Sequence, residues 1–144
     1  MIIFTIGYAQ KTAAKFFEAI RTNEIDVLID VRRYNSSQLA GFTKGCDLEY
    51  FLSQICDCRY IWATQFAPTA ALLDDYKKNR ISWNEYEKIY RKLLDGQDLR
   101  FFEAYANQRI CLLCAEHLPE RCHRRLLAEK AAAEYPSAEV RHLF

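Results

Sequence analysis

Most of the side chains that could do chemistry lie in one short segment, residues 111–124, of this 144-residue chain. The segment runs Cys-Leu-Leu-Cys-Ala-Glu-His-Leu-Pro-Glu-Arg-Cys-His-Arg and combines thiols, carboxylates, imidazoles and guanidinium groups. We predict a buried strand at its start and a helix from near Pro119, because proline is tolerated at the first helical position. Cys122 would then lie in or beside the first helical turn, where free N–H groups and the helix dipole favour an anion. Positive side chains at 121 and 123–125 would further favour a Cys122 thiolate, which is a nucleophile and a metal ligand.

These residue types suggest nucleophilic and acid–base chemistry. Cys122 is the candidate reactive thiol, and His123 or Glu116 could carry a proton. Asp30, at the end of an earlier predicted strand, is a further candidate catalytic carboxylate. The alternative for Asp30 and Arg32 is a local salt bridge that stabilises the strand end.

Several polar residues follow predicted strands. In an open parallel sheet, ligands bind outside the carboxyl ends of the strands, so we expect these residues to line one cleft with the Cys-His-Arg segment. Arg32 and Arg124, with the helix N-terminus, would hold a phosphate or a carboxylate. The other candidate substrate-binding residues are Thr5, Gly7 and Tyr8. The alternative role for Gly7 is a turn that needs a positive φ.

A metal site is a second interpretation of the same segment. Cys111 and Cys114 have C-x-x-C spacing, but residues three apart on a strand face opposite sides and cannot easily bind one ion. Cys111 is therefore expected in the core. Cys114, Cys122 and His123 remain as a candidate ligand set, with Glu116 as a candidate fourth ligand. The sequence identifies no cofactor.

The composition predicts one folded domain over residues 1–144. Hydrophobic residues make up 51% of the chain, and glycine and proline are few, which argues against disorder. A net charge of +1 provides no overall attraction to nucleic acid or membranes. The apolar runs are too short to span a bilayer, and no signal peptide is recognised. We expect a cytoplasmic protein with no membrane partner, and reduced thiols rather than a disulfide scaffold. The sequence does not indicate an oligomeric state.

Strands and helices alternate along the chain. Strands are predicted at 2–7, 26–31, 59–63, 109–115 and 139–144. Helices are predicted at 12–22, after a candidate N-cap at Asp47, and at 122–135, with a polar loop over 32–45. Near-continuous apolar strands alternating with helices are typical of a parallel sheet covered on both faces. We therefore predict a three-layer α/β fold with a mostly parallel sheet of four or five strands.

Residues 69–107 interrupt this alternation and are predicted to form a helical insertion. Trp83, Tyr86, Tyr90 and Leu93 recur at steps of three and four residues, which gives one apolar helix face. We favour a helical hairpin packed on the sheet. The alternative is a lid whose rings stack on a base or another planar group.

Three motifs are shared with a known family. They are Thr-Ile-Gly-Tyr at 5–8, Leu-Ile-Asp-Val-Arg at 28–32, and Cys-Ala-Glu-x2-Pro-x2-Cys-His-Arg at 114–124. Over essentially its whole length the chain resembles bacterial proteins of the domain of unknown function 488 (DUF488) family. The resemblance implies a compact α/β domain and assigns no activity. Many members have Arg-Ser-x-Pro-x-Ser after the second strand and Leu-Gly-Gly after the third, where this chain has Arg-Arg-Tyr-Asn-Ser-Ser and Thr-Gln-Phe. A ligand shared by the family would thus be bound differently here.

The leading functional interpretation is an intracellular enzyme-like domain with a phosphate-binding cleft and a Cys-His-Arg centre. A nucleotide or a nucleic-acid end is the preferred substrate class, because arginines suit phosphates and aromatic rings suit bases. Two alternatives remain: a non-catalytic module that binds nucleic acid or protein, and a small Cys/His metal-binding protein.

Overall fold

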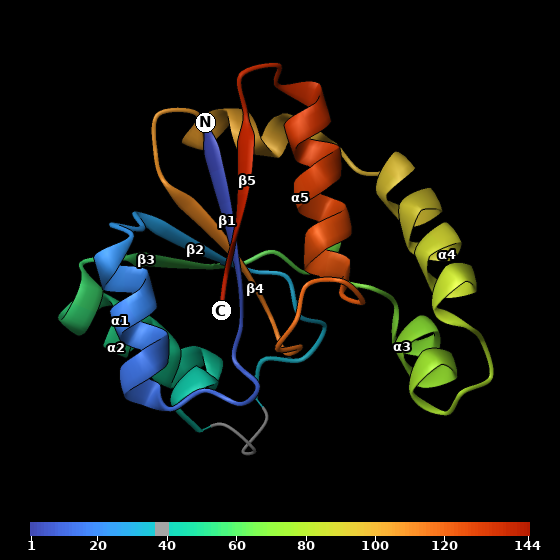
Figure 1. Cartoon of the computed structure of the whole chain (residues 1–144), viewed down its shortest axis with the longest axis horizontal. Coiled ribbons are helices and arrows are strands. Elements are labelled where there is room, and N and C mark those ends of the chain that lie inside the picture. The colour runs from blue at the N-terminus through green and yellow to red at the C-terminus, as the bar shows by residue number, and fades with distance from the viewer. Residues whose placement is uncertain (37–40) are drawn as a thin grey trace.

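The computed structural model describes residues 1–36 and 41–144 and contains one sheet of five parallel strands (Figure 1). The strands are β1 (Ile2–Gly7), β2 (Val27–Asp30), β3 (Arg59–Trp62), β4 (Ile110–Cys114) and β5 (Glu139–Leu143). Their order across the sheet is β3-β2-β4-β1-β5, and every neighbouring pair is parallel. The predicted α/β class is confirmed. The loop predicted over 32–45 includes residues 37–40, which lie outside the described residues.

Helices cover both faces of the sheet (Figure 1). On one face, α1 (Ala13–Thr22) and α2 (Gly45–Cys56) bury Phe16 and Leu48 against Phe4 of β1. The opposite face is covered by α4 (Trp83–Asp95), the 3-10 helix η3 (Leu99–Tyr105) and α5 (His123–Glu134). Because both faces are covered, β1, β2 and β4 are almost wholly apolar, as expected for central parallel strands.

Side chains cap most of the helix starts. Thr12 accepts a hydrogen bond from the backbone of α1, and Ser82 forms a capping box with Glu85 at the start of α4. The start of α2 differs from the prediction. Asp47 lies in the first turn and is not the N-cap, because α2 begins at Gly45. The amide of Gly45 donates instead to the carbonyl oxygen of Asn35, at 2.6 Å.

The insertion over residues 69–107 is wholly helical, as predicted, and comprises α3 (Ala70–Lys77), α4 and η3. Tyr86 and Tyr90 are buried, and the hydroxyl of Tyr90 donates to the carbonyl oxygen of Phe66 at 2.6 Å. Leu94, and not Leu93, completes the fully buried part of this helix face. The rings belong to the core, which confirms the packed hairpin over the lid.

No helix in the described part of the chain is long and apolar enough to cross a membrane.

Candidate site at the carboxyl edge of the sheet

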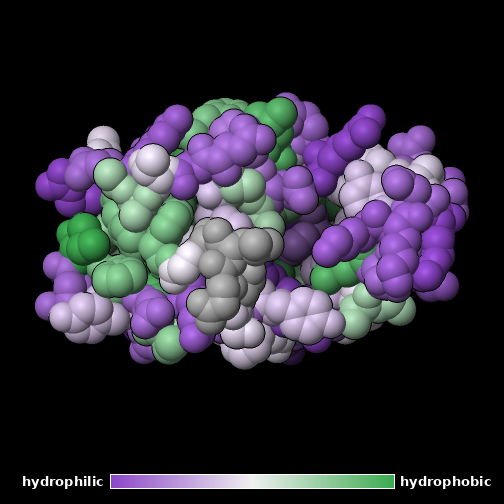
Figure 2. Space-filling view, turned by 90° about the horizontal axis from the view of Figure 1, so that it is seen from below, coloured by the Kyte–Doolittle hydropathy of each residue, from purple (hydrophilic) through white to green (hydrophobic). Residues whose placement is uncertain are grey.

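The carboxyl ends of β1, β2 and β4 meet at one edge of the sheet. β4 lies between the other two strands, with Gly7 beside Cys114 and Asp30 beside Leu113. From β1 the chain crosses over α1 to β2, whereas from β4 it crosses over α5 to β5 on the other side of β1. Crossovers that leave on opposite faces make this edge the usual place for a ligand in an open α/β sheet. Figure 2 looks onto this edge, which carries both hydrophilic and hydrophobic patches.

Cys114, Cys122 and His123 form a compact cluster there, and we call it the thiol cluster. Cys114 ends β4, Cys122 directly precedes α5, and His123 is the first residue of α5. One candidate ligand atom from each residue lies within 4.8 Å of the other two. All three side chains are buried, at 1%, 3% and 8% exposed.

The two sulfur atoms of the thiol cluster are in direct contact, and the structure pairs them as a disulfide. The expectation of reduced thiols is therefore not met for Cys114 and Cys122. It holds for the other four cysteines, Cys46, Cys56, Cys58 and Cys111, which are free. Cys111 packs on the opposite face of β4 among core residues, as predicted, and burial raises the pKa of its thiol.

Cys122 lies directly before the first turn of α5, as predicted, but the role of Pro119 and the exposure of the thiol differ from the prediction. α5 begins at His123, and Pro119 belongs to the preceding turn, where its carbonyl accepts from the amide of Cys122 at 3.2 Å. Cys122 is the N-cap residue, with an extended backbone and no side-chain capping bond. The expectation of an open thiol is wrong, because the sulfur faces inward to Cys114.

His123 is held in one orientation. Its Nε2 lies 2.8 Å from the carbonyl oxygen of Val31, and a carbonyl can only accept, so Nε2 carries the hydrogen and Nδ1 keeps its lone pair. Burial lowers the pKa of His123 to about 4, so the ring is neutral at neutral pH. The positive charge expected from His123 is therefore absent. The neutral ring can accept a proton or bind a metal.

Arg124 is fully buried, and its contacts are within the protein. Its Nη1 donates to Sγ of Cys114 at 3.0 Å and to the carbonyl oxygen of Glu116 at 2.5 Å. Its Nε contacts the hydroxyl of Thr5 at 3.4 Å, and Nη2 contacts the carbonyl oxygen of His117 at 3.3 Å. Burial lowers the pKa of Arg124 to about 10, which leaves it cationic at neutral pH. A thiolate on Cys114 would be stabilised by this cation.

Gly7 lets the loop after β4 approach β1. A Cβ at this position would overlap the carbonyl oxygen of Glu116 and lie 2.9 Å from Nη1 of Arg124. No glycine in the described residues has a positive φ, so the predicted turn role is wrong. Gly7 is needed for close approach. Tyr8 follows it, half-buried, with the guanidinium of Arg32 over its ring at 5.4 Å.

Asp30 and Arg32 form the salt bridge that was the alternative interpretation. The carboxylate is fully buried and accepts from Nε and Nη2 of Arg32 at 2.8 and 2.7 Å. It also accepts from the hydroxyl of Tyr60 at 2.6 Å, and Arg32 donates to the carbonyl oxygen of Thr43 at 2.7 Å. Burial opposes ionisation of Arg32, but the hydrogen bonds and charge of Asp30 outweigh it and raise the pKa of Arg32. The Asp30–Arg32 pair links the end of β2 to Tyr60 of β3 and to Thr43.

Sequence reasoning missed three residues at this edge. Lys11, after β1, is 8% exposed, and its Nζ has no hydrogen-bond partner in the described residues; the same is true of Nδ1 of His117. Burial, then the charges of Arg124 and Lys15, lower the pKa of Lys11. His142 of β5 lies 2.7 Å from the hydroxyl of Thr5, its neighbour in the sheet register. The pairing of β5 with β1, which the sequence does not show, was needed to find His142.

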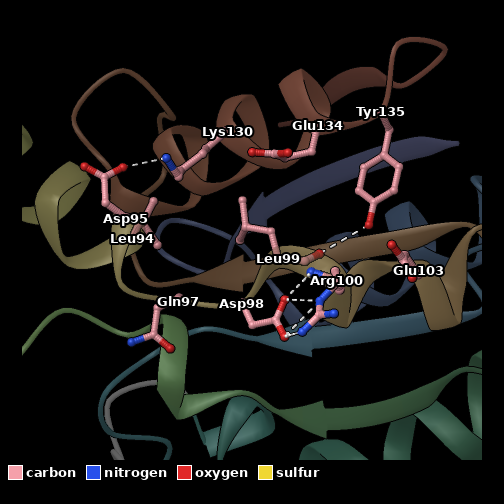
Figure 3. Close-up of a pocket in the computed structure, with 10 residues that line it drawn as sticks. All are labelled: Leu94, Asp95, Gln97, Asp98, Leu99, Arg100, Glu103, Lys130, Glu134 and Tyr135. Atoms are coloured by element: carbon pink, nitrogen blue, oxygen red, sulfur yellow. Dashed lines mark hydrogen bonds and ion pairs between the residues drawn. The ribbon is translucent and has the colours of Figure 1, made fainter.

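A separate pocket lies away from the thiol cluster. It has a volume of about 380 Å³ and is bounded by the end of α4, η3 and the C-terminal half of α5 (Figure 3). Its charged side chains are largely paired, as in Lys130 with Asp95 at 2.7 Å and Arg100 with Asp98 at 2.9 Å. The thiol cluster lies at the other end of α5, so this pocket is not part of the site.

A parallel sheet with helices on both faces, and a buried Cys-His-Arg group at its carboxyl edge, define an α/β domain with a cysteine-centred site. The chain matches the family model described as Domain of unknown function DUF488 over residues 12–131. It therefore belongs to this family, as the motifs indicated. No curated protein and no solved structure matches the chain.

Proposed function

We propose that this protein is an enzyme-like domain that binds a phosphate-bearing ligand at the carboxyl edge of its sheet, next to the Cys-His-Arg group. The observation that carries the proposal is the buried, unpartnered ammonium group of Lys11. A buried charge without a partner is costly, because the lost hydration is not replaced. Arg124 adds a second buried cation whose charge acts on Lys11. A bound anion would compensate both.

Two helix starts support the same interpretation. α1 begins two residues after Lys11, and α5 begins at His123, directly before Arg124. Neither helix has an acidic residue in its first turn. The free N–H groups and the dipole at a helix N-terminus favour a negative group.

The sequence favours Arg32 and Arg124 as the residues that hold the phosphate, but the structure favours a different cation for the direct contact. The guanidinium groups of Arg32 and Arg124 are occupied by Asp30, Thr43 and other protein acceptors. We therefore assign the direct contact to Lys11. Arg32 and Arg124 would support the site through their charge and by fixing Tyr8, Thr5 and the loop over Gly7.

A nucleotide or the end of a nucleic acid is the ligand class that we propose. Tyr34 follows the carboxyl end of β2, and Trp62 is the last residue of β3; they are 63% and 45% exposed. The indole N–H of Trp62 donates to the carbonyl oxygen of Arg32 at 2.9 Å, which fixes its ring near this edge. Exposed rings beside a phosphate site can stack on a base.

For the chemistry we propose that an external dithiol first reduces the Cys114–Cys122 disulfide by thiol–disulfide exchange and is itself oxidised to its disulfide. One freed thiol is then the nucleophile, and Nδ1 of His123 accepts its proton. Arg124 favours the thiolate of Cys114, so Cys114 shares this role with Cys122. The side chain of Glu116 is exposed and could exchange protons with solvent, whereas Asp30 would act by orienting Arg32.

The test compares two lysines in a binding titration with a nucleoside monophosphate. We expect Lys11→Met to weaken binding at least about tenfold, the effect of losing a hydrogen bond to a charged group. Lys92→Met, at an exposed position in the last turn of α4, is the control and should bind normally. The parent nucleoside, which lacks the phosphate, should bind weakly to all three proteins. Equal affinity of wild type and Lys11→Met for the monophosphate would contradict the proposal.

A further inference from the structure

We propose that Cys114, Cys122 and His123 bind one thiophilic metal ion of the zinc type. This proposal does not depend on the anion contact of Lys11. It concerns the reduced protein, in which an external dithiol has opened the Cys114–Cys122 disulfide, and it gives the thiols and His123 the role of metal ligands in place of nucleophile and proton acceptor. Thiolate sulfur and imidazole nitrogen are the ligands that zinc prefers in proteins. The structure brings one such atom from each residue within 4.8 Å of the others, in a buried position.

His123 is oriented as metal-binding histidines are. Its Nε2 donates to the backbone carbonyl oxygen of Val31 at 2.8 Å, which leaves the lone pair of Nδ1 available. Metal-ligating histidines commonly donate their second ring N–H to a carbonyl or a carboxylate, and this bond fixes the ring. The orientation therefore exists before any ion binds.

The spacing of the two cysteines also suits an ion. Their Cα atoms are 7.7 Å apart, whereas disulfides usually join Cα atoms about 4.4–6.8 Å apart. Two thiolates bound to one tetrahedral zinc ion lie about 3.8 Å apart, because each Zn–S bond is about 2.3 Å long. The backbone positions of β4 and α5 thus accommodate a shared ion.

Charge and rigidity complete the argument. Two thiolates offset the charge of a divalent ion, and Arg124 donates to Sγ of Cys114 at 3.0 Å, as a supporting contact around the ligands. The ligands come from the end of a strand and the start of a helix, which hold them more firmly than a loop would. Three protein ligands leave a fourth position for water or for a ligand atom.

The first experiment measures metal on the protein, purified without a polyhistidine tag and under reducing conditions. We expect about one zinc ion per chain, or uptake of one added cobalt ion with a thiolate-to-cobalt charge-transfer band. Bound zinc should also protect two thiols from alkylation, and peptide mapping should identify them as Cys114 and Cys122. A reduced protein that takes up neither ion, and whose thiols are modified equally with and without zinc, would overturn the proposal.

The second experiment uses two serine variants. Cys122→Ser is chosen because serine is favoured at a helix N-cap, so the start of α5 should be retained. It should lose the cobalt–thiolate band or weaken metal binding at least tenfold. Cys46→Ser, at an exposed cysteine of α2, is the matched control and should bind one ion normally. A folded Cys122→Ser protein that binds metal like the wild type would overturn the proposal. The alkylation measurement on the wild type decides the matter if this variant does not fold.

Discussion

The guanidinium of Arg124 ends inside the protein, although the sequence places it beside a candidate anion site. It joins β1, β4 and the loop after β4 through Thr5, Cys114 and Glu116. A lysine could not make these contacts together, because they use the planar fork of arginine. Lys11 shows the opposite behaviour, since its buried Nζ has no hydrogen-bond partner in the described part of the chain. At this edge Arg124, which belongs to the Cys-His-Arg motif, supports the structure. Lys11 lies outside the motif, and it is the residue that we propose to contact the ligand.

We predict that Gly7→Ala destabilises the protein by about 3 kcal/mol, in the range of severe overpacking. The added methyl group would overlap the carbonyl oxygen of Glu116, so the loop after β4 must move away from β1. Gly96→Ala is the control, because its Cβ would meet its nearest atom at an ordinary 3.5 Å. Urea unfolding measures both. Equal stability of the two variants would show that the loop does not depend on Gly7.

Lys11→Met should stabilise the ligand-free protein by about 1–2 kcal/mol at neutral pH, since it removes an unpaired buried charge. The pKa of Lys11 is lowered in the folded state by burial and by the charges of Arg124 and Lys15. Between that lowered value and 10.5, the unfolded chain binds more protons, so wild-type stability rises with pH. The advantage of Lys11→Met should therefore shrink as pH approaches 10.5. Thermal unfolding in phosphate-free buffer at several pH values tests this; an advantage that grows with pH would contradict it.

At the scale of helices and strands, the sequence predicts which elements are present better than it predicts the residue at which each helix begins. The predicted ranges match all five strands to within one residue. Apolar runs located β1, β2 and β4, because a strand covered on both faces must be apolar. The predicted range 122–135 matches α5 to within one residue, whereas a helix start near Pro119 is wrong, since a proline suits a turn before a helix as well as the first helical turn. Pro119 is in such a turn. The same error left open the direction of the Cys122 side chain, which depends on where the helix begins.

Ser82→Ala should reduce stability by about 1 kcal/mol, because the amide of Glu85 would lose its bond to the Ser82 hydroxyl. The second bond of the capping box, from the backbone amide of residue 82 to the Glu85 carboxylate, would remain. α4 supplies Tyr86 and Tyr90 to the core, so fraying at its start affects packing on the sheet. Ser53→Ala, at an exposed position inside α2, should cost nothing, since alanine favours helix interiors. Chemical denaturation compares the two. A loss of equal size in both variants would show that the cap contributes nothing specific.

At the scale of the whole molecule, the alternating elements predict a parallel sheet but not the order of its strands. That order depends on which faces the crossovers cover, and β1 receives β5 as a neighbour only in the folded chain. Thr5 therefore acquired a partner, His142, that no local pattern indicated. That Gly7, Asp30 and Cys114 would meet at one edge was predictable, because the carboxyl ends of parallel strands share an edge in any strand order. The contact between Cys114 and Cys122 could not be predicted, because it depends on the directions in which the two side chains point.

Hydrogen exchange should divide the sheet into a protected centre and two weaker edges. β1, β2 and β4 are buried on both faces, whereas β3 and β5 each have exposed residues and one free edge. Amides of the three central strands should exchange slowest, since they open only in global unfolding. Exchange followed by peptide mass spectrometry tests the order. Protection of β3 equal to that of β4 would contradict it.

The parallel pairing of β1 with β5 decides where an affinity tag should be attached. Met1 accepts a hydrogen bond from the amide of Glu139 at the amino edge of the sheet, whereas Phe144 follows β5 at the carboxyl edge (Figure 1). The two residues are separated by the length of a strand, about 20 Å for six residues. A polyhistidine tag on Phe144 would lie beside His142 and could compete with the thiol cluster for metal. A tag on Met1 would extend from the far edge, so Met1 is the better attachment point for purification, with the tag removed before metal is measured.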